Sequence, residues 1–267
     1  MKTIGFIGIG NMGGAMAKAC AALNKGCVWI FDLNKSLYDA FGSYQTVRCA
    51  ENIKEIMEVC DYVIMSIKPQ YYQDVAKEIK AFVKEEQVII TVAPSFSLGD
   101  MEQLLGQQTK LIRTMPNTPA LIGEGITAYC YNSRIKDEEE LADFIQYFKS
   151  FGELVKIDEK LMPAVVATTG SSPAYAYLFI EAMADAAVSF GMPRNMAYQM
   201  AAMAIKGSAE MILRTGKHPG ELKDAVTSPG GTTIKAVLAM EENGFRNSVI
   251  KGMEACYKQV SDMAQSK

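Results

Sequence analysis

The sequence predicts an α/β domain over residues 1–158 followed by an all-α domain over residues 159–267. Up to residue 157, short apolar runs alternate with amphipathic stretches, which is typical of repeated βαβ units on a parallel sheet. From residue 159 onward no β pattern continues, and this part holds 18 alanines and 10 of the 17 methionines. That composition favours closely packed helices.

The predicted elements follow from length and apolar spacing. Seven short apolar segments are predicted strands, at residues 3–8, 27–32, 61–67, 87–92, 110–114, 126–131 and 153–157. Apolar residues at three- and four-residue spacing predict crossover helices at 12–24, 70–84 and 137–151. In the second domain, helices are expected at 174–192 and 194–213 and after a turn at 229–231.

Charge and cysteine content exclude several classes of protein. Residues 1–158 carry 16 basic and 20 acidic groups, and residues 159–267 carry 11 and 10, so neither part has the basic excess of a nucleic-acid-binding surface. The six cysteines form no C-x-x-C pair, and His218 cannot complete a zinc site with them. We expect no metal, and reduced, buried cysteines in a cytoplasmic protein.

Two apolar stretches could suggest a membrane or a secretory signal. The N-terminal stretch is interrupted by Gly5, Gly8 and Gly10, which argues against a signal peptide. The stretch 174–192 contains Glu181 and Asp185, which favours a buried or interface helix over a membrane span.

A glycine loop follows the first predicted strand. Gly8, Gly10 and Gly13 form G-x-G-x-x-G between that strand and an apolar helix, and Asp32 ends the second strand 19 residues after Gly13. In this context the glycines serve a tight turn, a close approach to a pyrophosphate and helix-on-strand packing, while the acid holds ribose hydroxyls. The first domain is therefore predicted to be a Rossmann-type dinucleotide-binding domain. The alternative is a set of purely structural glycines.

Residues near two strand ends bear on the choice and position of the cofactor. Asp32 favours NADH because a carboxylate repels the 2′-phosphate of NADPH, whereas Asn34, Lys35 and Ser36 could hold that phosphate or form only a polar turn. The segment Ile67–Pro69 falls at the carboxyl edge of the sheet and is expected beside the nicotinamide half.

A second group of interest is the turn before a late helix. Pro229, Gly230 and Gly231 precede a predicted N-cap, Thr232, and leave several free amides suited to a small carboxylate. Thr233 adds a hydroxyl that can donate to a substrate heteroatom. A substrate loop and an ordinary helix start are both compatible with these residues.

Four segments together resemble pyrroline-5-carboxylate reductases, and the resemblance runs essentially end to end. They are Gly5–Gly13, Arg113–Pro119, Gly170–Tyr175 and Leu222–Ile234. The resemblance implies reduction of 1-pyrroline-5-carboxylate to L-proline, the last step of proline biosynthesis, with NADPH or NADH. It also implies a C-terminal dimerisation domain that interleaves with that of a second subunit, active sites built from two chains, and in many members larger rings.

The resemblance also implies roles for single residues. Ile7, Gly8, Gly10, Asn11 and Met12 match the pyrophosphate loop, Asn52 an adenosine-side asparagine, and Ile67, Lys68 and Pro69 the nicotinamide-side segment. Glu159 matches an acid near the substrate, and Ser228, Gly230, Gly231, Thr232 and Thr233 match the carboxylate-and-imine loop, with Thr233 catalytic. Two features depart from the family pattern: Ala93–Ser95 replaces an Ala-Ala-Gly turn, and Asp32 replaces a serine or threonine.

Two other functions compete with this one. A β-hydroxyacid dehydrogenase has a similar opening, but it carries a lysine on the long helix after the dinucleotide domain, and residues 170–181 contain none. A redox-sensing regulator would bind the dinucleotide without needing the amide-rich loop around Gly230. His218 lies in a turn and lacks the setting of a general base.

Overall fold

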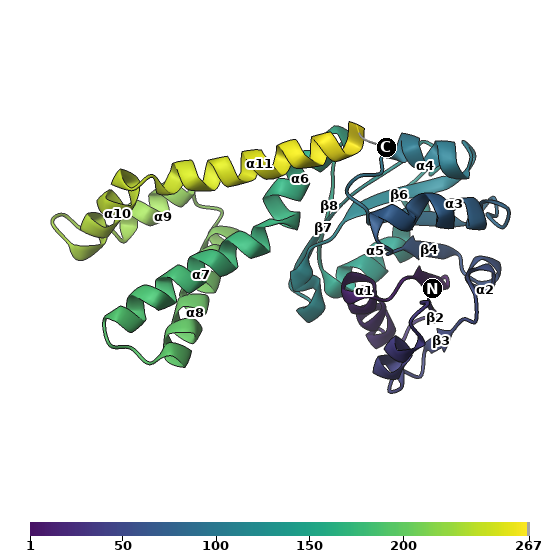
Figure 1. Ribbon diagram of the computed structural model, residues 1–267, viewed down its shortest axis with the longest axis horizontal. Helices are drawn as coiled ribbons and strands as arrows, with labels where there is room; N and C mark the ends of the chain where they lie inside the picture. Colours follow the sequence, from purple (N-terminus) through teal and green to yellow (C-terminus); the bar gives the residue numbers. More distant parts are fainter. Residues whose placement is uncertain (266–267) are drawn as a thin grey trace. The chain divides into compact units, whose positions relative to one another are not determined.

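A computed structural model of the chain describes residues 1–265, and these form two compact units (Figure 1). The first unit comprises Met1–Ser171 and the end of the chain from Cys256, and the second comprises Ser172–Ala255. The first unit is built on a sheet, whereas the second contains only helices among its described residues. The predicted fold class is therefore confirmed.

The sheet has eight strands in the order β3-β2-β1-β4-β5-β6-β7-β8. Neighbouring strands are parallel except for β6 and β7, which are antiparallel. The strands are β1 (Ile4–Ile7), β2 (Val28–Phe31), β3 (Val47–Cys49), β4 (Tyr62–Met65), β5 (Val88–Thr91), β6 (Lys110–Met115), β7 (Gly125–Tyr131) and β8 (Gly152–Lys156). All seven predicted strands are present. Only β3 was not predicted, because three residues at the sheet edge carry no apolar run.

Six α-helices belong to the part of the first unit before Ser171. They are α1 (Asn11–Ala22), α2 (Ile53–Val59), α3 (Tyr72–Lys80), α4 (Leu98–Leu105), α5 (Ala142–Phe148) and α6 (Met162–Val165). The helix predicted over 137–151 was too long, because its two ends are 3₁₀ turns. Helices α2 and α4 were not predicted. Their start signals are side-chain caps, with Asn52 accepting from Glu55 N and Ser97 forming a capping box with Asp100.

Both faces of the sheet are covered, so alternate strand residues enter two separate cores. Ile30, Ile64 and Ile90 pack with α1 and α5 on one face. Val63 and Ile89 pack with α2, α3 and α4 on the other face. Burial on both faces explains why these strands read as continuous apolar runs.

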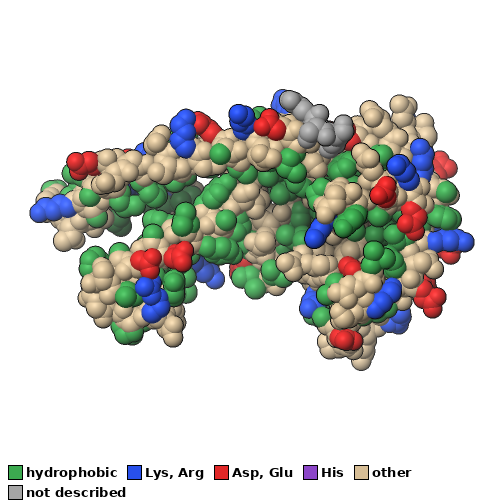
Figure 2. Space-filling view, in the orientation of Figure 1, with side chains coloured by type: hydrophobic (Ala, Val, Ile, Leu, Met, Phe, Trp, Pro, Cys, Tyr) green, Lys and Arg blue, Asp and Glu red, His purple; other side chains and the backbone are tan. Residues whose placement is uncertain are grey.

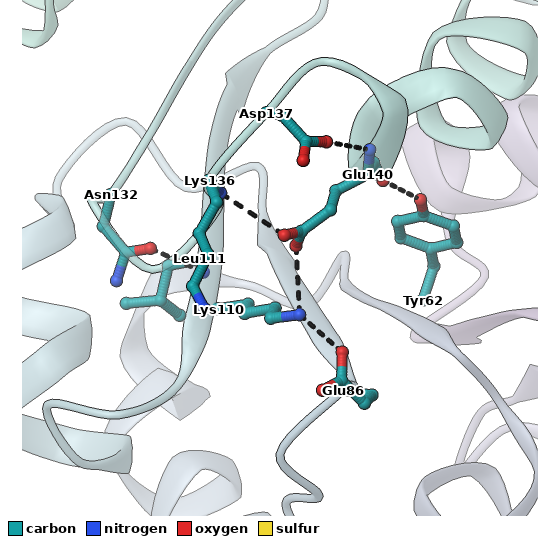
Figure 3. A network of polar contacts seen from close by, with 8 residues as sticks. All are labelled: Tyr62, Glu86, Lys110, Leu111, Asn132, Lys136, Asp137 and Glu140. Carbon is teal, nitrogen blue, oxygen red and sulfur yellow. Dashed lines mark hydrogen bonds and ion pairs between the residues drawn. The ribbon is translucent and has the colours of Figure 1, made fainter.

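Ion pairs hold the amino edge of the sheet around Lys110, the first residue of β6 (Figure 3). Lys110 Nζ lies 2.6 Å from Glu86 Oε2 and 3.0 Å from Glu140 Oε2. The Tyr62 hydroxyl donates to Glu140 O at 2.7 Å. The hydrogen bond to Glu86, and that to Glu140, raise the pKa of Lys110. This network ties the starts of β5 and β6 to the turn before α5.

The second unit has almost no interior of its own. Its helices are α7 (Ser172–Ser189), α8 (Arg194–Thr215), α9 (Pro219–Ala225), α10 (Thr232–Glu242) and the first part of α11 (Phe245–Gln265). Among its described residues only Ala184, Ala197 and Ala201 are buried. Figure 2 shows apolar side chains along these helices, and Leu178, Met203 and Leu213 are 68%, 63% and 79% exposed.

Two further observations concern the chain as a whole. Within residues 1–265, no helix is both long and apolar enough to span a bilayer. The expectation that the cysteines are buried was wrong in part, since Cys27 and Cys49 are exposed and Cys256 is half-buried.

Candidate functional site

The glycine loop occupies the space between β1 and α1, and two of its glycines are required by the fold. Gly8 has φ +92°, and a Cβ there would lie 2.7 Å from Ser66 O. A Cβ on Gly13 would lie 2.2 Å from Gly8 O and 2.5 Å from Ser66 Oγ. Any larger side chain at either position would therefore displace backbone.

Gly10 differs from these two glycines because nothing in the chain crowds it. Its φ is −63°, and a Cβ there would meet nothing within 4 Å. Helix α1 begins at the next residue, Asn11, with no side-chain cap and no acidic residue in its first turn. A bare backbone at an uncapped helix start is suited to binding a pyrophosphate. The loop thus fits a dinucleotide phosphate, and Gly10 keeps the approach open.

A cleft of about 440 Å³ opens beside this loop and brings most of the predicted cofactor residues together. Those lining it are Ile7, Gly8, Gly10, Asp32, Asn52, Ile67 and Lys68. Asn11 lines a neighbouring cavity with Gly10, whereas Met12, Gly13, Asn34 and Pro69 line neither. Sequence reasoning missed the cleft residues Leu33, Tyr71 and Val75. Leu33 and Tyr71 are 89% and 55% exposed, and apolar walls of this kind suit a planar base.

Asp32 is tied to the backbone through both carboxylate oxygens. Oδ2 accepts from Ile9 N at 2.9 Å and Oδ1 accepts from Asn34 N at 2.8 Å. Asn34 in turn accepts from Ser36 N and Ser36 Oγ, so residues 34–36 form a polar turn. Lys35 Nζ donates to the Tyr38 hydroxyl at 2.8 Å. Asp32 therefore anchors the glycine loop as well as bordering the cleft.

Tyr72 fastens the carboxyl ends of β4 and β5. Its buried hydroxyl donates to Met65 O and accepts from Thr91 Oγ1 at 3.1 Å and Val92 N at 3.2 Å. Its ring stacks on Phe96, with centroids 4.8 Å apart. Burial raises the pKa of Tyr72 to about 12.

Glu159, predicted beside the substrate, is held inside the first unit. Its Oε1 accepts from Arg113 Nη1 at 2.8 Å and from Leu98 N at 2.7 Å. Arg113 Nη2 donates to Pro94 O at 2.8 Å. These contacts connect the segment after β8 with β6 and with the loop after β5.

The loop Ser228–Thr233 lies in the second unit and ends at the start of α10. Gly230 has φ +68°, and a Cβ on Gly231 would lie 2.6 Å from Ser228 Oγ. The N-cap is Gly231, which makes no side-chain cap, so the prediction of Thr232 as N-cap was wrong by one residue. The cause is that Gly231 N donates to Ser228 O and closes the turn there. Thr232 and Thr233 are exposed in the first turn of the helix.

His218 has a structural partner. It is the N-cap of α9, and its Nδ1 accepts from Gly220 N at 3.0 Å. This contact accounts for the residue without a catalytic role.

Family models match both parts of the chain. Residues 159–263 match the model described as pyrroline-5-carboxylate reductase dimerisation. Residues 3–95 match the model described as NADP oxidoreductase, coenzyme F420-dependent.

Similar proteins are found over the full length. The pyrroline-5-carboxylate reductase of Escherichia coli is 42% identical over 99% of both chains, and that of Arabidopsis thaliana is 36% identical over 98% of this chain and 96% of its own. The solved pyrroline carboxylate reductase of Plasmodium falciparum with NADP bound is 30% identical over 98% of both chains, with a TM-score of 0.89.

Proposed function

Because this chain belongs to the pyrroline-5-carboxylate reductase family, we propose that it reduces 1-pyrroline-5-carboxylate to L-proline with a hydride from NADPH or NADH. This reaction is the last step of proline biosynthesis. The observation within the chain that carries the proposal is the bare backbone at Gly10 beside the cleft, which provides the cofactor half of the reaction.

The first unit supplies the cofactor site in this proposal. Gly10 and the free amides at the start of α1 would hold the pyrophosphate. Asp32 and Asn52 would border the adenosine side of the cleft, and Ile67 and Lys68, followed by Pro69, the nicotinamide side. When bound, the cofactor supplies the hydride from its nicotinamide ring. The residues of the chain bind and orient the two reactants, which removes most of the entropic barrier to their encounter.

The loop Ser228–Thr233 supplies the substrate site. The amides of the first turn of α10 bind the substrate carboxylate, because uncapped amides at a helix start attract a small anion. The Gly231 amide is not among them, since it donates to Ser228 O. The Thr233 hydroxyl hydrogen-bonds the ring nitrogen, where charge develops as the carbon accepts hydride. If that nitrogen is already protonated, Thr233 orients the ring and is not the proton source.

Both cofactors are expected to serve, with the Asp32 charge favouring NADH. Asp32→Asn removes the charge and keeps an acceptor for the backbone, whereas Asp32→Ser shortens the anchor as well. We expect Asp32→Asn to shift the ratio of kcat/KM toward NADPH, because it removes the repulsion of the 2′-phosphate, by about tenfold, which corresponds to ~1.4 kcal/mol. An unchanged ratio in both variants would show that Asp32 does not face the ribose.

The proposed assembly is a homodimer in which the second units interleave and each active site draws on two chains. The support is that this unit buries only three alanines while leaving long apolar side chains exposed. Gly207 has open space around its Cβ position within this chain, which leaves room for close approach by another helix. A protein surface this apolar is typical of an interface.

One assay tests the reaction. Purified protein is mixed with the imine and either NADPH or NADH, and loss of reduced nicotinamide absorbance is followed together with proline formation. We expect stoichiometric conversion with at least one cofactor. Cofactor binding without oxidation of either one would favour a dinucleotide-sensing protein instead.

A further inference from the structure

We propose that Arg113 is a positioning residue that holds the loop after β5 in place against the nicotinamide ring. The inference rests on the proposed function, because it assigns a role in that reaction to a side chain of the first unit.

Arg113 lies in the middle of β6 and is buried, with its side chain 8% exposed. One arm of the guanidinium donates to Pro94 O and the other to Glu159 Oε1, each at 2.8 Å. The same Glu159 oxygen accepts from Leu98 N, the first residue of α4. The planar fork of Arg113 therefore fixes both ends of the segment 94–98, directly at Pro94 and through Glu159 at Leu98.

Two other contacts hold this segment, so the loop has little freedom. Phe96 stacks on the Tyr72 ring, and Ser97 and Asp100 cap each other at the start of α4. The bonds to Pro94 O and Leu98 N, by contrast, come from charged side chains outside the segment, Arg113 and Glu159. The segment Ala93–Ser95 also stands where the family resemblance implies an Ala-Ala-Gly turn.

The position of the loop after β5 in the sheet indicates which part of a bound dinucleotide it contacts. In a doubly wound sheet a dinucleotide lies across the carboxyl ends of the strands, with its pyrophosphate at the first glycine loop. The adenosine side is toward β2, where Asp32 and Asn52 line the cleft. The nicotinamide side is therefore toward β4, β5 and β6, and the loop after β5 lies at that end.

Stability alone is a poor explanation for Arg113. A buried ion pair contributes little net stability, because desolvation of both charges offsets their attraction. Among the described residues, no group accepts a hydrogen bond from the buried Arg113 Nε. A buried donor left unsatisfied disfavours folding, so the arginine is better explained by the geometry that its two outer nitrogens impose.

The test compares Arg113→Met with a control on the same strand, Lys110→Met. Lys110 is also ion-paired and mostly buried, but it lies at the amino edge with Glu86 and Glu140 (Figure 3). We would measure kcat and the KM for NADPH at saturating imine, and NADPH affinity by fluorescence titration. We would also measure the kinetic isotope effect with cofactor deuterated at the transferred position. All measurements are made well below the unfolding temperature of each variant.

We expect Arg113→Met to lower kcat by about 10- to 100-fold, because a displacement of about 1 Å between reacting groups has that effect. Its isotope effect should rise as hydride transfer becomes slower, while NADPH affinity stays within about twofold of wild type. Lys110→Met should keep the wild-type kcat and isotope effect. Glu159→Gln keeps the acceptor for Leu98 N and should show a smaller change in the same direction, which provides a test if Arg113→Met does not fold.

Two results would overturn the inference: a kcat of Arg113→Met within about twofold of that of Lys110→Met, or a lower kcat with an unchanged isotope effect. If Arg113→Met does not fold, a wild-type isotope effect in Glu159→Gln would overturn the inference instead. Failure of the proposed function is distinguished from these outcomes, because it would appear as no imine-dependent turnover in the wild-type protein.

Discussion

At the scale of single residues, the three glycines of the loop have different physical reasons to be glycine. Gly8 and Gly13 are required because backbone and Ser66 occupy the place of a Cβ. Gly10 is not crowded by any atom of the chain. Of the three, Gly10 alone indicates a ligand directly, because the open space at its Cβ position is not needed for packing within the chain.

This difference gives a paired prediction. Gly10→Val should fold with an unchanged unfolding temperature and lose at least about tenfold in NADPH affinity, or ~1.4 kcal/mol, by blocking the pyrophosphate. Gly13→Ala should instead destabilise the protein by about 1–3 kcal/mol, because its Cβ overlaps the Gly8 carbonyl. Calorimetry and fluorescence titration separate the two effects. Wild-type cofactor affinity in Gly10→Val would show that the loop has been misassigned.

The proposed role of the Thr233 hydroxyl can be tested by removing it. Thr233→Ala should lower kcat by about 10- to 1000-fold, as loss of a single positioned hydrogen-bonding group does, without affecting cofactor affinity. Thr233→Ser keeps the hydroxyl and should retain most of the activity. Thr232→Ala should act more on the KM for the imine, because Thr232 lies at the helix start beside the backbone amides that are proposed to bind the substrate carboxylate. A Thr233→Ala variant with the wild-type rate at saturating imine would leave Thr233 as a helix-start residue only.

At the scale of elements, one side chain from α3 holds two strands together at the carboxyl edge of the sheet. The Tyr72 hydroxyl joins the ends of β4 and β5 through Met65 O and Val92 N. Because burial raises the pKa of Tyr72 to about 12, the folded chain keeps the proton at a pH where the unfolded chain loses it. Ionisation above the ordinary pKa of about 10 therefore favours unfolding.

The resulting prediction concerns alkaline stability. The contribution of Tyr72 is fully present below pH 10 and should be lost between about pH 10 and 12, with a loss of about 2–3 kcal/mol. Tyr72→Phe should be less stable at neutral pH by about 1–3 kcal/mol, because Met65 O loses its donor. Its stability should then fall less steeply above pH 10 than that of the wild type. Parallel pH slopes in urea titrations of the two proteins would contradict this account.

At the scale of the whole molecule, the two units differ in how far one chain can complete them. The first has a core on each face of its sheet, whereas the described residues of the second bury only three alanines. A helical unit that leaves Leu178, Met203 and Leu213 exposed cannot be stable through its own packing. Assembly with a second copy would bury these side chains.

We therefore predict that the minimal active unit is a dimer. Met203→Glu places a charge on the exposed apolar side of α8 and should shift the protein toward monomer in sedimentation velocity, with activity lost in parallel. Gln45→Glu adds the same charge at an exposed position of the first unit, and it should leave the oligomeric state and the activity unchanged. A monomer with full specific activity would exclude active sites built from two chains.

The two-part architecture and the glycine loop between β1 and α1 could both be predicted from the sequence. Both features are encoded locally: alternating apolar runs specify strands and crossover helices, and the glycine spacing before α1 specifies the phosphate loop. The short elements β3 and α2 were missed, because a three-residue edge strand and a seven-residue helix show little periodicity. The turn around Gly230 was predicted from its residues, and the helix after it begins one residue earlier than predicted, at Thr232.

The contacts between residues distant in the sequence could not be predicted and are seen in the folded chain. The fold joined Asp32 to Ile9 N across the first βαβ unit, and Arg113 to Glu159 across 46 positions. It also distinguished Gly10 from Gly13, which look alike in the motif, by the atoms that surround each. Such contacts depend on strand order and helix packing, and no local pattern carries that information. A sequence motif therefore indicates which residues take part, and the folded chain shows which atoms each of them meets.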